Sequence, residues 1–222
     1  MTVPGTVPAS TSTVFTGWPT DATAFLAAIA RDNTAEFWAA HRHRYTASVL
    51  PPLRALAAAL EPEFGPVRIL RPHRNRRFRP DAEPYRTDAG GVAGTAGGTE
   101  LSVVLSAAAL TVQVGRFTFA GEALACYRAA VAAESGIVLA ALLDGLAADG
   151  FTVVDGPALI GHPRGYRSDH PRIALLRLRS LYVRRSWPVG EWLGTHEPLA
   201  RVAGAWRAAR PLAAWLDAHA SS

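Results

Sequence analysis

Two β-rich runs that lie close together constrain the fold of this chain most. Residues 101–106 and 110–114 are rich in valine and leucine, and only a few small residues separate them. Runs of this composition with so short a connection predict an antiparallel meander. Phe117 to Phe119 is a candidate third strand of that meander, and shorter β-rich runs at 67–70, 151–154 and 181–183 are candidates for further strands.

Helical patterns come before this sheet. Apolar residues recur at helical spacing after Trp18-Pro19, where Thr20 or Asp21 can cap a first helix. Asn33-Thr34 ends that helix and offers the cap of a second one. Pro51-Pro52 interrupts the pattern, which then resumes. The first sixty residues therefore predict a helical hairpin or triplet.

Helical patterns also follow the sheet. Residues 121–131 and 138–146 have amphipathic spacing, and 195–218 is helical with a break at Pro211. A chain of 222 residues fits one large domain. We therefore expect a single α+β domain over 14–218, with a central antiparallel sheet, helices packed on it, and short tails at 1–13 and 219–222.

Positive charge is concentrated in two short segments, 67–87 and 164–185. Each segment has seven arginines, against two acids in the first and one in the second. The remainder of the chain has nine arginines and fifteen acids, so the formal net charge of +5 hides a strong asymmetry. If the fold brings the two segments together, they form a preformed anion site.

Several classes of chemistry are excluded or disfavoured by composition. The chain has no lysine, which excludes Schiff-base chemistry and a P-loop. The single cysteine, Cys126, excludes an internal disulfide, and no His or Cys ligand spacing indicates a metal site. We expect no cofactor, no membrane span and no secretory signal, and hence a cytoplasmic protein. Residues 88–99 are almost wholly Gly, Ala and Thr and predict a flexible loop.

Three groups of motifs, in order along the chain, carry a resemblance to a known family. They are Phe15-Thr-Gly-Trp-Pro19 with Asn33-Thr-Ala-Glu-Phe-Trp38, His41 and Tyr45; Arg74-Asn-Arg-Arg-Phe78 with Pro84-Tyr-Arg-Thr87; and Pro163-Arg-Gly-Tyr166 with Asp169-His-Pro171 and Leu175-Leu-Arg177. Together they resemble the bacterial family called domain of unknown function 2461 over about residues 14–218. The resemblance implies one α+β domain and implies no function.

The chain departs from the pattern of that family in the second motif. Asn75 stands where the family usually has aspartate, Ala82 and Arg86 stand where it usually has lysine, and Pro80 is unusual. If the aspartate transfers protons in relatives, Asn75 cannot do so here.

The first arginine-rich segment contains the best candidate site. Three prolines stiffen it, so its guanidinium groups lose less entropy when they bind a ligand. Tyr85 adds a hydroxyl group and a stacking surface. The candidate anion-binding residues of this segment are Arg74, Arg76, Arg77, Tyr85 and Arg86.

The second segment contains another candidate, the turn with Arg164, Tyr166 and Arg167. Ser168 or Asp169 can cap a following helix, whose N-terminus would present free backbone N–H groups to an anion. The alternative is an ordinary capped turn, in which Asp169 pairs with a neighbouring arginine and His170 belongs to the cap.

Three functions remain open. The first, which we favour, is a binding module for an anionic ligand, either a phosphorylated small molecule or, with weaker support, a nucleic-acid backbone. The second is a small enzyme with arginine clamps and His73, His170 or Tyr85 in proton transfer. The third is a structural or interaction protein in which the arginines pair with the acids of the same chain.

Overall fold

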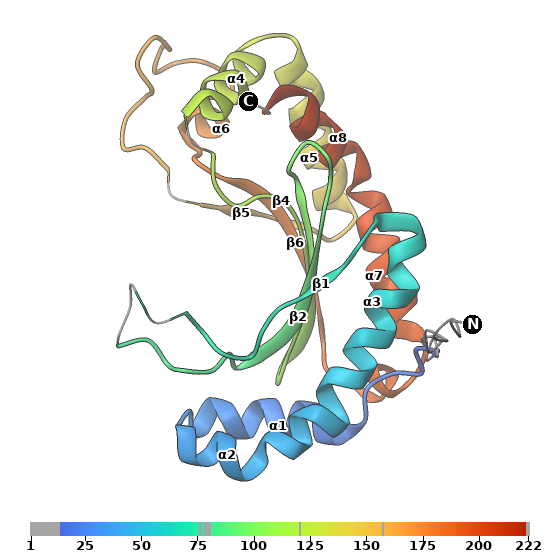
Figure 1. The fold of residues 1–222 in the computed structure, drawn as a ribbon. Coiled ribbons are helices and arrows are strands. Elements are labelled where there is room, and N and C mark those ends of the chain that lie inside the picture. Colours follow the sequence, from blue (N-terminus) through green and yellow to red (C-terminus); the bar gives the residue numbers. More distant parts are fainter. Residues whose placement is uncertain (1–13, 76, 78–80, 120, 157, 221–222) are drawn as a thin grey trace, which may run out of the picture.

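The computed structural model describes residues 14–75, 77, 81–119, 121–156 and 158–220, and the predicted tail at 1–13 lies outside them. It confirms a single α+β domain, with one six-stranded sheet and helices on it (Figure 1). Among the described residues, no single helix is both long and apolar enough to cross a membrane, although two helices joined by an 88° bend match in length and composition.

The sheet is antiparallel throughout, with the strand order β1-β2-β3-β4-β6-β5. Its strands are β1 (Arg68–Ile69), β2 (Asp88–Gly94), β3 (Glu100–Ser106), β4 (Ala109–Arg116), β5 (Thr152–Asp155) and β6 (Leu181–Pro188). The predicted hairpin is β3–β4, in which Leu105 pairs with Leu110. Phe117 to Phe119 is not a strand; the ring of Phe119 stacks on Tyr127 instead, with the ring centroids 4.4 Å apart.

The predicted flexible loop at 88–99 is wrong, because most of it forms strand β2. Residues 88–94 pair along their whole length with β3. At Gly90 a Cβ atom would lie 2.3 Å from the carbonyl oxygen of Val103, and at Gly91 it would lie 2.8 Å from the side chain of Val67. Glycine therefore permits a close approach of neighbouring chains here, a role that composition alone does not distinguish from flexibility.

The N-terminal helices form the predicted triplet. They are α1 (Thr20–Arg31), α2 (Ala35–Arg44) and α3 (Leu50–Phe64), and a π-helical turn, η1 (Tyr45–Val49), joins the last two. Thr34 caps α2 as expected, since its hydroxyl accepts a hydrogen bond from the amide of Phe37 at 3.1 Å. Pro51 and Pro52 occupy the first turn of α3, where proline costs no hydrogen bond.

The expected cap of α1 is absent, because Pro19 precedes the helix and no side chain bonds to its first amides. Asp21 turns instead toward α2 and η1. Its carboxylate accepts hydrogen bonds from Arg44 Nε at 3.0 Å and from the hydroxyl of Ser48 at 2.8 Å. This ion pair lowers the pKa of Asp21 below its usual value.

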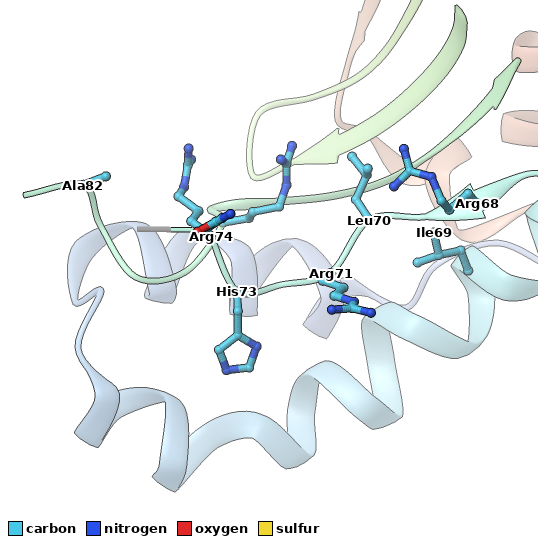
Figure 2. A pocket seen from close by; sticks show the side chains of 9 residues that line it. Arg68, Ile69, Leu70, Arg71, His73, Arg74 and Ala82 are labelled. Carbon is cyan, nitrogen blue, oxygen red and sulfur yellow. The ribbon is translucent and has the colours of Figure 1, made fainter. Parts of the chain in front are cut away.

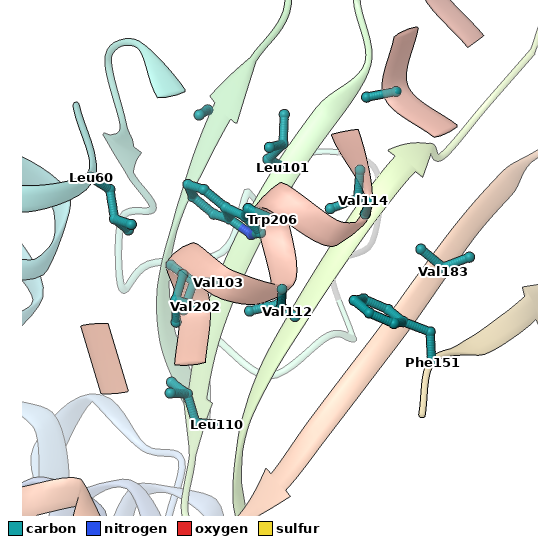
Figure 3. Packing of buried hydrophobic residues seen from close by; sticks show 14 of the residues in the cluster. Leu60, Leu101, Val103, Leu110, Val112, Val114, Phe151, Val183, Val202 and Trp206 are labelled. Carbon is teal, nitrogen blue, oxygen red and sulfur yellow. The ribbon is translucent and has the colours of Figure 1, made fainter. Parts of the chain in front are cut away.

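The remaining helices are α4 (Gly121–Ala132), α5 (Ser135–Ala148), α6 (Ile173–Arg177), the 3-10 turn η2 (Glu191–Gly194), α7 (Glu197–Ala208) and α8 (Arg210–His219). Helices α3, α5, α7 and α8 lie along one face of the sheet, and no described helix lies along the other (Figure 1). Trp206 of α7 is fully buried among valines and leucines of the sheet (Figure 3), and its indole N–H donates to the carbonyl of Ser102 at 3.3 Å. The core therefore lies between this helical layer and one face of the sheet.

Candidate anion-binding site

Alternation along the strands divides the residues of the sheet between its two faces. Leu101, Val103 and Leu105 of β3 are buried in the core. The residues between them, such as Ser102, therefore point to the face that no described helix covers. The same alternation in β4 places Thr111 on that uncovered face. This second face is built mainly from small and polar side chains.

Both arginine-rich segments border the uncovered face. The loop between β1 and β2 and the loop between β5 and α6 project on that side of the sheet, at its opposite ends (Figure 1). The two segments therefore do not merge into a single cluster. They border one surface from two ends, and each must be considered as a site by itself.

The first segment forms a pocket of about 670 Å³. Its lining includes four arginines, namely Arg68, Arg71, Arg74 and Arg86. Figure 2 shows that the side chains of Arg68 and Arg74 extend to one side of the segment, whereas those of Arg71 and His73 extend to the other. Asn75 and Ala82 also line the pocket.

Backbone pairing holds this segment in shape. His73 and Tyr85 form an antiparallel bridge, the amide of Arg74 donates to the carbonyl of Pro84 at 2.8 Å, and the amide of Arg86 donates to the carbonyl of Pro72 at 2.7 Å. The two halves of the segment thus form a short ribbon. This ribbon fixes the positions from which Arg74 and Arg86 extend.

Asn33, at the end of α1, fastens the ribbon to the helices. Its side-chain oxygen accepts from the amide of Tyr85 at 2.9 Å, and its side-chain nitrogen donates to the carbonyl of Tyr85 at 3.0 Å. The Tyr85 ring is 7% exposed and stacks on Trp38, with the ring centroids 4.7 Å apart. We expected Tyr85 to offer its ring to a ligand, but that ring is part of the core.

The charge in the pocket is only partly neutralised by the protein itself. Of the carboxylates that the structure describes, Asp88 alone pairs with an arginine of the pocket, and it lies 2.6 Å from Arg86. Nε of Arg74 donates to the carbonyl of Tyr85 at 3.2 Å, which orients the side chain without removing its charge. Among the described residues, Arg68, Arg71 and Arg74 therefore lack the carboxylate partners that the structural hypothesis expects of them.

Of the other candidates in the first segment, Arg77 is not among the described residues that line the pocket. Arg77 is exposed, and its amide donates to the side-chain oxygen of Asn75 at 3.1 Å, which closes a tight turn. Arg76 lies outside the described residues. Arg68 and Arg71 were not predicted as site residues, although alternation in the predicted strand at 67–70 was a signal that Arg68 points away from the core.

The second segment offers a weaker site. Arg167 makes two hydrogen bonds to Asp169, at 2.8 and 2.6 Å, and both side chains are largely exposed. This confirms the expected pairing of Asp169 with a neighbouring arginine, and it leaves Arg167 partly neutralised. Arg164 is exposed, whereas Tyr166 is half-buried against the core.

The expected anion site at a helix N-terminus is not formed. Helix α6 has five residues and begins only at Ile173, and neither Ser168 nor Asp169 caps it. Nδ1 of His170 instead accepts a hydrogen bond from the amide of Arg172 at 3.1 Å, so the ring closes a turn, which is close to the capping role expected of it. So short a helix presents little aligned dipole to an anion.

Comparison with known protein families shows to which family the chain belongs. The family model described as conserved hypothetical protein (DUF2461) matches residues 21–215. The chain belongs to this family. The match confirms the resemblance carried by the three motifs, and the description of the family names no activity. No curated protein matches the chain.

The resemblance to DUF2461 set this chain apart from the motif pattern at four positions. Three of them, Asn75, Ala82 and Arg86, line the pocket. The fourth, Pro80, lies outside the described residues.

Proposed function

We propose that this DUF2461 protein is a cytoplasmic binding module for a phosphorylated small molecule. The arginine-lined pocket holds that ligand. The observation that carries the proposal is the presence of Arg68 and Arg74 at one cavity, with side chains that extend to the same side and have no carboxylate partner among the described residues. Guanidinium groups grip phosphate through two parallel hydrogen bonds, which makes arginine well suited to this ligand.

The size and rigidity of the pocket support the same function. A volume of about 670 Å³ falls within the usual range for small-molecule sites, about 300–1,000 Å³. The ribbon and the Asn33 contacts hold the backbone of the segment before a ligand arrives. Less conformational entropy is then lost on binding.

Binding is favoured over catalysis by the groups that line the pocket. His73 is the one histidine among the described residues that line the pocket. Its ring lies edge-on to Trp38, with the ring centroids 5.5 Å apart, and extends away from the Arg74 side chain (Figure 2). The amide of Asn75 cannot act as a general acid or base, at the position where the family resemblance implies aspartate. The pocket thus supplies cations to bind an anion but no well-placed general base.

Thermal unfolding with and without pyrophosphate tests the proposal. A ligand present at 100 times its Kd stabilises the native state by about 2.7 kcal/mol, which raises the Tm of a chain of this size by roughly 5–10 °C. Arg74→Gln should abolish most of this rise. Arg207→Gln is the matched control, since it removes the same charge from an exposed position on α7, where Arg210 also pairs with Glu63. An equal rise in both variants would show that pyrophosphate binds elsewhere.

A further inference from the structure

The uncovered face of the sheet links the pocket to the second arginine-rich segment. The strand register places Arg68, Val92, Ser102, Gln113 and Arg184 in one row that crosses the sheet from β1 to β6. An arginine thus stands toward each end of the row, and small or polar residues lie between them. Arg184 is exposed and has no ion pair among the described residues.

The distance between these two arginines exceeds the reach of one phosphate group. Four strand intervals separate β1 from β6 in the sheet order. At about 4.8 Å per interval, the backbone positions of Arg68 and Arg184 lie roughly 19 Å apart. A ligand that contacts both must carry anionic groups along an extended chain.

The surface between the two arginines is flat, because many of its side chains are small, and it carries groups that can form hydrogen bonds. The neighbouring row consists of Gly90, Val104, Thr111 and Ser186, and the hydroxyl groups of Thr111 and Ser186 lie 2.9 Å apart. Small side chains leave room for a flat group to lie against the sheet. The amide of Gln113 offers both a donor and an acceptor, as recognition of a base edge requires.

An aromatic side chain lies on the same face beside this row. Tyr182 precedes Arg184 by two residues in β6 and therefore points to the same side of the sheet. Its ring is half-buried and contacts Phe117, with the ring centroids 4.6 Å apart. Aromatic side chains beside a cationic track are the usual means of holding single-stranded bases.

We propose that this face binds single-stranded nucleic acid, with the phosphate backbone running from the pocket near Arg68 across the sheet to Arg184. The inference rests on the proposed anion pocket, which holds one end of the strand. It adds a second cationic end, a hydrogen-bonding surface and a stacking residue. The arginines bind the backbone, and Gln113 and Tyr182 contact the bases.

Fluorescence anisotropy with a labelled twelve-nucleotide oligothymidylate tests this assignment. Arg184→Gln should weaken binding several-fold and reduce the slope of log K against log salt concentration by about 0.7, since one phosphate contact is lost. Tyr182→Leu should weaken binding about fivefold through lost stacking. Arg207→Gln, on the helical layer, should bind like the wild type. Equal affinity of Arg184→Gln and Arg207→Gln would overturn the proposal.

Pyrophosphate and the oligonucleotide, tested on the same variants, distinguish the nucleic-acid inference from the proposed function of the pocket. Pyrophosphate binding should be lost in Arg74→Gln and kept in Arg184→Gln. If pyrophosphate binds in that manner and the oligonucleotide does not, the sheet-face inference fails and the pocket function stands. If neither binds, both fail. Tighter binding of a twelve-base-pair duplex would overturn the single-strand assignment. Inorganic polyphosphate that competes equally, with no effect of Tyr182→Leu, would reduce the surface to a general polyanion site.

Discussion

The carboxylate of Asp217, near the end of α8, accepts a hydrogen bond from the hydroxyl of Thr99 at 2.6 Å. The same carboxylate oxygen accepts from the amide of Thr99 at 3.2 Å and from the hydroxyl of Thr95 at 2.9 Å. The last helix thereby fastens the turn between β2 and β3. Because β2 also pairs with β1, this contact supports the sheet edge from which the arginine-lined pocket extends.

Removing this carboxylate should destabilise the whole domain. Thr99 is fully buried, so Asp217→Ala leaves its hydroxyl without an acceptor, while its amide still donates to the hydroxyl of Thr95 at 2.9 Å. Unsatisfied buried groups cost about 1–3 kcal/mol, and we expect the free energy of unfolding to fall by about 2 kcal/mol. Urea denaturation measures the change. Asp149→Ala, at an exposed position after α5, is the control. Equal midpoints for the two variants would contradict the role assigned to Asp217.

The glycines of β2 provide a matched pair of substitutions. A Cβ atom at Gly90 would meet a backbone carbonyl at 2.3 Å, whereas one at Gly94 would meet nothing within 4 Å. Gly90→Ala should therefore lower the free energy of unfolding by about 1–3 kcal/mol, as overpacking does. Gly94→Ala should leave it unchanged or raise it by up to about 1 kcal/mol. Urea denaturation of both variants separates close packing of β2 from mere chain flexibility, which would favour alanine at either position.

These glycines also show why strand β2 was not predicted from the sequence. Residues 101–106 and 110–114 reveal their strands because apolar side chains alternate with polar ones, a local signal. Strand β2 has no such signal, since its glycines fit against Val103 and Val67, which lie outside the segment. Local composition therefore indicated a loop, while the partners of the segment determined a strand.

The candidate site, too, could be predicted only in part, because only some of its features have a local signal in the sequence. The charge of the segment at 67–87 is visible in the sequence, and Arg74 and Arg86 do line the pocket. The burial of Tyr85 was not visible, because it depends on Trp38 and Asn33 of the N-terminal helices. Charge can be read locally, whereas the orientation of a side chain depends on contacts between distant parts of the chain.

Asn33 should control the affinity of the pocket as a positioning residue. Asn33→Ala removes both hydrogen bonds to the backbone of Tyr85, so the ribbon that carries Arg74 and Arg86 loses its attachment to α1. We expect a loss of about 1–2 kcal/mol in the free energy of unfolding and a several-fold rise in the Kd for pyrophosphate. Urea denaturation measures the first effect and calorimetric titration the second.

The neighbouring residue supplies the control for this prediction. Thr34→Ala removes the cap of α2 and costs a similar amount of stability, about 1 kcal/mol, without contacting the ribbon. Its Kd for pyrophosphate should stay at the wild-type value. If both variants lose affinity equally, Asn33 acts through general stability and has no particular effect on the pocket.

Alkaline pH should destabilise the protein through two tyrosines. Burial raises the pKa of Tyr45 and of Tyr127, whose hydroxyl donates to the carbonyl of Leu175 at 3.0 Å. In the unfolded chain these groups lose their protons near pH 10, while in the native state they keep them. The native state then binds more protons than the unfolded state. Stability is therefore complete below about pH 10 and falls above it, by at most about 1.4 kcal/mol per pH unit for each tyrosine.

The absence of lysine makes this effect unusually clear, because no lysine titrates in the same range. Urea denaturation between about pH 9 and 11, on either side of the ordinary tyrosine pKa, measures the slope of the unfolding free energy against pH. Tyr127→Phe and Tyr45→Phe should each reduce that slope, and the double variant should reduce it most. Slopes are compared instead of absolute stabilities, because Tyr127→Phe also loses its hydrogen bond to Leu175. An unchanged slope in the double variant would assign alkaline unfolding to other groups.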